Sequence, residues 1–376
     1  MTDSTSSMAL AFTPESLDDH PEVNRFVARL GYGEFDPATL AAHGGRNLNW
    51  SGTTTTGDRL FVKALPTIAD IAQTALRRTL AYETVAKTRP PGSPLRSPDL
   101  LGTDEEAGLV AFRLVPGARG LNAVAVAGEL EPSVCQQAGA AVGALHGLDP
   151  GDLADETPLE MPPLAWLRAM PVVLLGGYTM AQLAGWRLVQ NDLPLVERLV
   201  ELREQESLAR KVPVHGDLRL DQFLISDGRV QLCDWEYFRL GDPARDVGAL
   251  VGELVFQAIY LALTDRKAAV ASGGTAELDH AEVRRRAGLG VDRAGVLVRA
   301  FWSGYRSAAP TDEGLSERAI GFAGWHMYDR LITWAEQNSQ LNPAAKAIAG
   351  IGRRLIISPA AAAELLGLKD RETQPC

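Results

Sequence analysis

A change in hydrophobic pattern near Gly117 divides the 376-residue chain into two parts. Before it, a Thr-rich run precedes the pair Gly57-Asp58 and the apolar residues 60–62 follow it, while two short apolar runs flank residues 103–108. Short apolar runs separated by turn residues predict two β-hairpins. Beyond Gly117, apolar residues recur at helical spacing through most of the chain. The sequence therefore predicts an α+β fold with two lobes, an antiparallel sheet with one helix followed by a larger, mainly helical part.

The expected helix of the first part lies between the two hairpins. Ala72, Leu76, Leu80 and Glu83 follow one another at spacings of four, four and three, which places them on one helical face. The apolar members mark the buried face, where an unpaired carboxylate would be costly. Lys63, in the first hairpin, is a partner that would offset this cost for Glu83.

We expect three segments along the chain: a loose tail over residues 1–22, an N-terminal lobe over 23–113 and a helical C-terminal lobe over 114–376. The tail is rich in Ser, Thr and Asp, where a secretory signal would need basic residues and then an apolar stretch. Helical periods are expected at residues 133–148, in a segment that opens at 192, and at 247–263, 282–306, 316–337 and 343–366. A strand, turn and strand interrupt them at residues 212–236.

Composition excludes several classes of function. The chain has 37 basic and 47 acidic residues, a net charge of −10, which argues against nucleic acid as the main partner. No apolar run reaches the length of about eighteen residues that a membrane helix needs, so no membrane span is expected. The three cysteines are far apart and predict neither a zinc site nor a disulfide framework, as in a reducing cytoplasm.

Three motifs in order carry the chemistry. His215-Gly216-Asp217 is followed by Gln222, and after a short hairpin comes Asp234 in the string LCDWE. A third motif, GDPARD, spans residues 241–246. Together they resemble the catalytic loop, metal-binding loop and downstream segment of the aminoglycoside phosphotransferase family, which is similar to protein kinases.

The resemblance implies roles for four of these residues. Asp217 would orient and deprotonate the acceptor hydroxyl, while His215 would brace the catalytic loop. Asp234 would hold Mg²⁺, which prefers carboxylate and phosphate oxygens. The family usually has Asn as a second magnesium ligand, where this chain has Gln222, which is longer by one methylene. The alternatives are that Asp217 caps a turn and that Asp234 is an ordinary surface residue at the end of a strand.

Residues of the first part are expected at the nucleotide, ATP. By resemblance, Lys63 would contact the phosphates and pair with Glu83. The turn that would cover the nucleotide lacks a G-x-G-x-x-G pattern, and the segment between the lobes would contact adenine through backbone groups. The expected contacts are Gly45, Asn47 and Asn49 in the turn, and Phe112, Arg113 and Leu114 in the connecting segment.

Fold and reaction do not name the acceptor. The string HGDLRLDQFL resembles kinases of class V lanthipeptide and thioamitide pathways, which implies a Ser or Thr of a ribosomally made peptide as acceptor and a partner lyase that eliminates the phosphate. One alternative is a phosphotransferase for a small cationic antibiotic, whose amines Asp242, Glu253 and Asp312 would bind. Another is a pseudokinase that binds without turnover, but the retention of both Asp217 and Asp234 argues against it.

Overall fold

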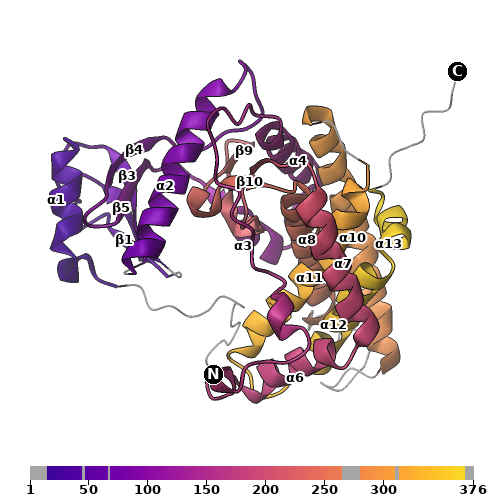
Figure 1. The fold of residues 1–376 in the computed structure, drawn as a ribbon. Helices are drawn as coiled ribbons and strands as arrows, with labels where there is room; N and C mark the ends of the chain where they lie inside the picture. Colours follow the sequence, from indigo (N-terminus) through magenta and orange to yellow (C-terminus); the bar gives the residue numbers. More distant parts are fainter. Residues whose placement is uncertain (1–14, 45–46, 67, 265–279, 310–312, 369–376) are drawn as a thin grey trace, which may run out of the picture. The chain divides into compact units, whose positions relative to one another are not determined.

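The computed structural model describes residues 15–44, 47–66, 68–264, 280–309 and 313–368 (Figure 1). The chain forms two compact units. The N-terminal unit comprises Met1–Thr88, Arg96–Ala118 and Leu232–Phe238, and the C-terminal unit comprises Arg89–Leu95, Arg119–Gln231 and Arg239–Cys376. The boundary therefore differs from the expected single division after residue 113, because a short segment from the middle of the chain packs within the N-terminal unit.

The described part of the N-terminal unit contains a five-stranded antiparallel sheet in the order β1-β2-β3-β5-β4. Its strands are β1 (Ala41–His43), β2 (Leu48–Thr53), β3 (Arg59–Ala64), β4 (Leu100–Asp104) and β5 (Leu109–Arg113). The two expected hairpins are β2–β3 and β4–β5, so both predictions are confirmed. Strand β1 was not predicted, since its three residues carry no alternating pattern.

Two helices, one on each face, cover this sheet (Figure 1). Neighbouring residues of a strand point to opposite faces: Ala111 of β5 packs on the side of α1 (Pro21–Arg29), and Val110 on the side of α2 (Ala69–Val85). The prediction of a single helix is wrong for this reason. The expected loose tail over residues 1–22 extends too far along the chain. A short 3-10 helix, Leu17–Asp19, lies within it and precedes α1, and Leu17 is buried.

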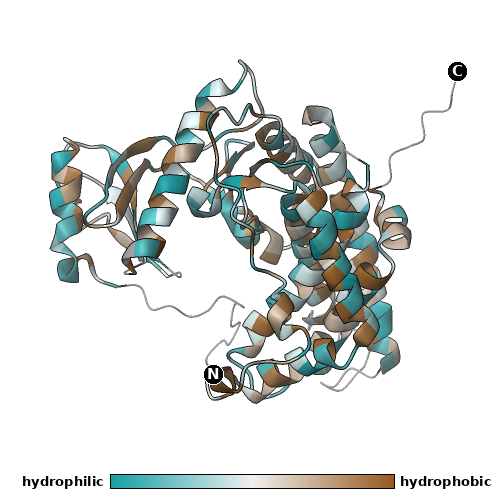
Figure 2. Ribbon diagram, viewed as in Figure 1, coloured by the Kyte–Doolittle hydropathy of each residue, from teal (hydrophilic) through white to brown (hydrophobic). Residues whose placement is uncertain are grey.

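The apolar stripe of α2 lies where the spacing predicted. Leu76 is buried and contacts Val110, with Ala72 and Leu80 partly buried beside it. Strands β3 and β5 carry nearly continuous hydrophobic residues (Figure 2), as expected for a sheet covered on both faces. Glu83, at the end of the stripe, is half-buried.

The segment Leu232–Phe238 joins the N-terminal unit through aromatic stacking. It contains a 3-10 helix, Trp235–Tyr237. The ring of Trp235 stacks on that of Tyr82 in α2, with centroids 3.4 Å apart and planes at 7°, and both side chains are buried. Because Trp235 follows Asp234 and Tyr82 precedes Glu83, the stack fixes the helix that carries one predicted site residue to the segment that carries another.

The C-terminal unit is mainly helical, as predicted. Its longer helices are α4 (Pro132–His146), α6 (Met180–Gln190), α7 (Leu193–Leu208), α8 (Ala244–Thr264), α10 (His280–Ala308), α11 (Leu315–Ala335), α12 (Pro343–Ile357) and α13 (Pro359–Leu366). Shorter elements are α3 (Leu121–Val126), α5 (Val172–Leu175), β6 (Arg119–Gly120), β7 (Val212–Val214), β8 (Phe223–Ser226), β9 (Arg229–Leu232) and β10 (Arg239–Gly241). The stretch 343–366 was expected as one helix but is two, because Pro359 cannot continue a helix.

Helices α4 and α10 approach each other at glycines. A Cβ atom on Gly139 would lie 2.0 Å from the carbonyl oxygen of Phe301, and one on Gly304 would lie 1.9 Å from that of Gln136. The two backbones are therefore in direct contact. Among the described residues, α8 is the one helix long and apolar enough to cross a membrane, with a mean hydropathy of 1.7, but 67% of that stretch is buried inside the protein, as in a core helix.

Candidate active site

The loop that carries Asp217 is held by one buried carboxylate. Asp246, at the start of α8, accepts hydrogen bonds from the backbone N–H groups of His215 (2.6 Å) and Gly216 (3.0 Å). Gly216 has a φ of +84°, a conformation that residues other than glycine rarely adopt. The imidazole of His215 is fully buried, and its Nδ1 accepts the N–H of Asp217 at 3.4 Å. His215 therefore supports the loop from inside.

Asp246 is itself anchored by a second buried pair. Its carboxylate contacts Nε2 of His146 at 3.1 Å, and the hydroxyl of Tyr305 lies 3.0 Å from Nδ1 of the same ring. Burial by itself would raise the pKa of Asp246, but His146 and the backbone N–H groups hold it below its usual value. The sequence marked GDPARD as a motif without revealing that its last residue binds the catalytic loop.

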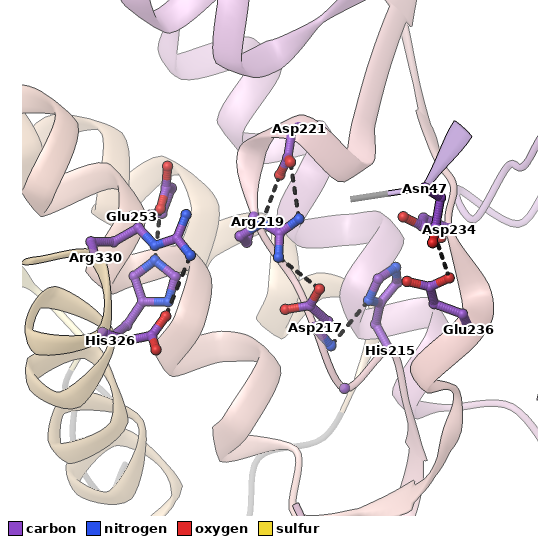
Figure 3. Close-up of polar contacts among 12 residues, drawn as sticks. Asn47, His215, Asp217, Arg219, Asp221, Asp234, Glu236, Glu253, His326 and Arg330 are labelled. Carbon is purple, nitrogen blue, oxygen red and sulfur yellow. Dashed lines mark hydrogen bonds and ion pairs between the residues drawn. The ribbon is translucent and has the colours of Figure 1, made fainter. Parts of the chain in front are cut away.

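Asp217 is partly exposed and is bridged by an arginine. Arg219 donates from Nη1 to Asp217 at 2.7 Å, and from Nε and Nη2 to Asp221 at 3.0 Å each (Figure 3). Burial alone would lower the pKa of Arg219, but the two carboxylates raise it instead. The guanidinium of Arg219 thus holds the Asp217 carboxylate in a fixed position next to Asp221. Sequence reasoning did not single out Arg219.

The remaining predicted residue of this loop, Gln222, is 4% exposed at the end of a 3-10 helix, Leu220–Gln222. Its role as a magnesium ligand stays a prediction.

Two acids that were expected to bind amines of a substrate pair instead with side chains of the protein itself. Asp242 accepts two hydrogen bonds from Arg318, at 2.8 and 3.1 Å, and is 1% exposed. Glu253 lies 2.6 Å from Nε2 of His326 (Figure 3) and is 5% exposed. The third, Asp312, lies outside the described residues. Burial and internal pairing make Asp242 and Glu253 structural residues, so they lend no support to recognition of a cation.

The pairing of Glu253 has a measurable pH dependence. Burial would raise the pKa of Glu253, but hydrogen bonding and charge from His326, with Arg330, lower it from 4.5 to about 2. A depressed folded-state pKa stabilises the protein above the unfolded-state value and ceases to do so as pH falls towards 2. We expect Glu253→Gln to lower the free energy of unfolding by about 3 kcal/mol near neutral pH, and by progressively less as pH falls below about 4.5.

Urea unfolding followed by tryptophan fluorescence would measure this difference. Glu317→Gln, on the exposed side of α11, removes a carboxylate without a buried partner and serves as control. A difference between wild type and Glu253→Gln that stays constant with pH would show that the Glu253 carboxylate is not stabilised in the folded protein.

In the N-terminal unit, Lys63 brings two carboxylates together. Its ammonium group pairs with Oδ1 of Asp234, which is 171 residues further along the chain, and with Oε2 of Glu236 at 3.1 Å. Burial would lower the pKa of Lys63, but Asp234 and Glu236 more than offset this and raise it. The structure thus unites two predicted site residues and adds Glu236, which the sequence analysis did not assign. The predicted pair of Lys63 with Glu83 stays a prediction.

Asn47 completes this cluster. Its Nδ2 donates to Oε2 of Glu236 at 3.1 Å (Figure 3), and the residue is 8% exposed. Among the described residues, no group donates a hydrogen bond to the buried Oδ1 of Asn47. Asp234 has a φ of +73°, which costs a residue other than glycine about 1 kcal/mol and is typical of functional positions.

Mg²⁺ fits this set of side chains chemically. It prefers hard oxygen ligands, usually one or two carboxylates with phosphate oxygens. Asp234 and Glu236 supply carboxylate oxygens, and Asn47 supplies an amide oxygen that has no donor. Side chains of the N-terminal unit therefore offer oxygen donors suited to a divalent cation.

The other expected nucleotide contacts lie in the same unit. Asn49 donates from Nδ2 to the carbonyl oxygen of Asn47 at 2.8 Å, which shapes the turn before β2. The N–H groups of Arg113 and Leu114 donate to the carbonyl oxygens of Asp99 and Arg59, both at 2.9 Å. Adenine could use these two donors only by replacing those bonds. The side chain of Phe112 packs against α2, and Gly45 lies outside the described residues.

A sheet carrying Lys63, a helix carrying Glu83 and a helical unit whose HGD loop presents Asp217 define a phosphotransferase with a protein-kinase-like fold. The chain belongs to the phosphotransferase enzyme family (APH), whose sequence model matches residues 38–284. It is accordingly an enzyme that transfers a phosphoryl group to a hydroxyl. The search of curated proteins found no match.

Solved structures share this fold at low sequence identity. A choline/ethanolamine kinase family protein from Mesorhizobium loti is 16% identical with a TM-score of 0.54, covering 94% of this chain and 99% of that one. Choline kinase LicA from Streptococcus pneumoniae is 14% identical with a TM-score of 0.52, covering 91% and 99%. Amicoumacin kinase hAmiN, solved with AMP-PNP and Ca²⁺, is 15% identical with a TM-score of 0.51, covering 91% and 96%.

Proposed function

We propose that the protein transfers the γ-phosphoryl group of Mg-ATP to a hydroxyl group, in the cytoplasm, where both ATP and Mg²⁺ are abundant. The observation that carries this proposal is the fixed catalytic loop, in which Asp246 accepts hydrogen bonds from the backbone N–H groups of His215 and Gly216 and Asp217 remains partly exposed. A bond forms between the acceptor oxygen and the γ-phosphorus, the bond from that phosphorus to the β–γ bridging oxygen breaks, and ADP leaves.

Each residue then has a role in this reaction. Asp217 orients the acceptor hydroxyl and takes its proton, a contribution of roughly 10²- to 10⁴-fold. Asp234, with Gln222 as a further candidate, holds Mg²⁺, which when bound neutralises charge on the phosphate oxygens. Lys63, which contacts Asp234 in this structure, would bind the α- and β-phosphates of the nucleotide, and Glu83 would orient it.

The acceptor we favour is a Ser or Thr of a ribosomally made precursor peptide, phosphorylated before a partner lyase eliminates the phosphate. The support for it is the resemblance of the string HGDLRLDQFL to kinases of such pathways. The internal pairing of Asp242 and Glu253 adds support, because it removes two acids that a polycationic antibiotic would have used.

A small-molecule hydroxyl is the second candidate. The similar solved structures include choline kinases and an amicoumacin kinase, whose acceptors are small molecules. A neutral small molecule would not need the carboxylates of Asp242 and Glu253, which pair with other residues of the protein.

Mass spectrometry of purified protein with Mg-ATP separates these candidates. We expect a Ser/Thr-containing precursor peptide to gain the mass of one phosphate, while choline and an aminoglycoside panel do not. Transfer to the panel but not to the peptide would exclude the peptide acceptor. Binding of nucleotide with no transfer to any acceptor would indicate a pseudokinase. Co-purification of a lyase with the tagged protein would test for the partner.

A further inference from the structure

Exposed apolar side chains gather in one stretch of the C-terminal unit. Fifteen large apolar side chains of the described residues are exposed, and eight of them lie between residues 161 and 193, in less than a tenth of the chain. Val172 and Val173, in α5, are 81% and 87% exposed. Single exposed apolar residues are ordinary, but a group of them marks a surface that binds a partner. The eight side chains form the apolar surface: Met161, Leu164, Val172, Val173, Leu175, Met180, Leu188 and Leu193.

Contacts within this stretch hold it on the helical unit. The ring of Trp166 lies 5.9 Å from that of Trp186 in α6, and Gln190 donates to the carbonyl oxygen of Trp166 at 2.9 Å. Thr179, which precedes α6, donates to the carbonyl oxygen of Ala335 in α11 at 2.6 Å. The stretch is therefore packed against the unit from inside, while the described residues leave the apolar side chains on its outer side uncovered.

The charge of the same stretch is opposite in sign to that of the chain. No Asp or Glu occurs in the sequence between Glu160 and Asp192, and the two charged residues in that interval are Arg168 and Arg187, both exposed. The chain as a whole has a net charge of −10. A basic and apolar surface complements a partner that is itself acidic and apolar.

The apolar surface is attached to the strand that leads into the catalytic loop. Arg239, in β10, donates to the carbonyl oxygen of Thr157 at 2.8 Å, and β10 pairs with β7, the strand before that loop. Arg245, in α8, donates to the carbonyl oxygen of Met161. A molecule bound at the apolar surface is therefore held on the same unit as Asp217.

We propose that the apolar surface docks a segment of the acceptor peptide that carries acidic and apolar residues and lies outside the phosphorylated Ser or Thr. This inference rests on the proposed peptide acceptor and adds a second point at which the protein holds it. A small-molecule acceptor would reach only the groups around Asp217 and would leave these side chains uncovered. An anionic membrane fits less well, because two arginines attract it weakly and the net charge of −10 opposes it.

Fluorescence anisotropy with a labelled model peptide tests the docking surface without any phosphate transfer. The probe is an amphipathic peptide of Leu and Glu at helical spacing, and its counterpart has Lys in place of Glu. We expect the full chain to bind the Glu peptide about tenfold or more tightly than the Lys peptide. Val173→Ser should weaken binding of the Glu peptide about tenfold, because an apolar side chain is lost from the complex. Leu208→Ser, in α7, removes a side chain that is also 87% exposed and should leave binding unchanged.

A charge variant gives a result that a change in packing alone would not. Arg168→Gln combined with Arg187→Gln should reduce the preference for the Glu peptide, with an unchanged melting temperature because both side chains are exposed. Equal binding of the two peptides by wild type, or Val173→Ser binding within about twofold of wild type, would overturn the docking surface. A wild-type dimer that Val173→Ser converts to a monomer, or binding to phosphatidylglycerol vesicles but not to the Glu peptide, would overturn it too, because another partner then covers these side chains.

Phosphate transfer separates this inference from the proposed function. One substrate is a Ser- and Thr-containing stretch alone, and the other joins that stretch to the Glu peptide through a flexible Gly/Ser linker. We expect kcat/KM to be about tenfold or more higher for the joined peptide, because docking raises the local concentration of the hydroxyl, and we expect Val173→Ser to abolish the gain. Equal transfer to both substrates would overturn the docking role and leave the kinase proposal standing. Transfer to neither, with the Glu peptide bound, would overturn the proposed peptide acceptor instead.

Discussion

Replacing Asp217 with Asn is expected to lower kcat for phosphoryl transfer by roughly 10²- to 10⁴-fold, the usual contribution of a general base. The side chain keeps its size, and its amide oxygen can still accept from Arg219, so the loop should keep its shape. What is lost is the negative charge that orients and accepts the proton of the acceptor hydroxyl. Single-turnover phosphate transfer and nucleotide affinity should both be measured. We expect the rate of transfer to fall and the affinity for nucleotide to stay unchanged, because only the chemical step depends on the lost charge.

Asp227→Asn is the matched control for this variant. Asp227 is exposed in the β8–β9 turn at a φ of +50°, where Asn is well tolerated. It should transfer phosphate at the wild-type rate. If Asp217→Asn also remains within a few-fold of wild type, Asp217 is not the base.

Replacing Asp246 with Asn is expected to reduce both stability and activity strongly. The N–H groups of His215 and Gly216 both point at this carboxylate, and an amide can accept them with only one of its two atoms. Loss of charge also weakens the hydrogen bond with Nε2 of His146. A buried donor left without an acceptor costs about 1 to 3 kcal/mol, so we expect a lower thermal midpoint and a kcat reduced along with it.

Thermal unfolding and kcat of the Asp246→Asn variant are the measurements. Asp292→Asn, on the exposed face of α10, changes the charge equally and should alter neither quantity. An unchanged midpoint in Asp246→Asn would mean that the network around the catalytic loop does not stabilise the unit. Unchanged activity would mean that Asp217 is positioned without it.

Much of the fold follows from local pattern. Hairpins β2–β3 and β4–β5 were predictable because runs of strand-forming residues flank turn residues, and α2 because its apolar stripe repeats at helical spacing. Helix α1 was missed, although Val23, Phe26 and Val27 have the right spacing, because the polar residues before them gave the impression of a long tail. The break between α12 and α13 was overlooked although Pro359 signals it.

Some residues of the candidate site could likewise be found from the sequence, and others could not. Asp217 and Asp234 could be found because their motifs are short and contiguous. Glu236, Arg219 and the anchoring role of Asp246 could not be assigned, because each acts through contacts that only the folded chain creates. The contact of Glu236 with Asn47 joins residues 189 positions apart. No local pattern encodes such a contact, whereas charge and burial in the structure make it evident.

The segment Leu232–Phe238 has a consequence for any attempt to divide the protein. A gene fragment ending near residue 118 would encode every strand of the N-terminal sheet yet omit Trp235, whose ring covers Tyr82. That fragment would expose an aromatic surface and leave Lys63 buried without its two counter-charges. Unlike a domain made of consecutive residues, this half should fold poorly when expressed alone, and a synthetic peptide of the missing piece should restore it.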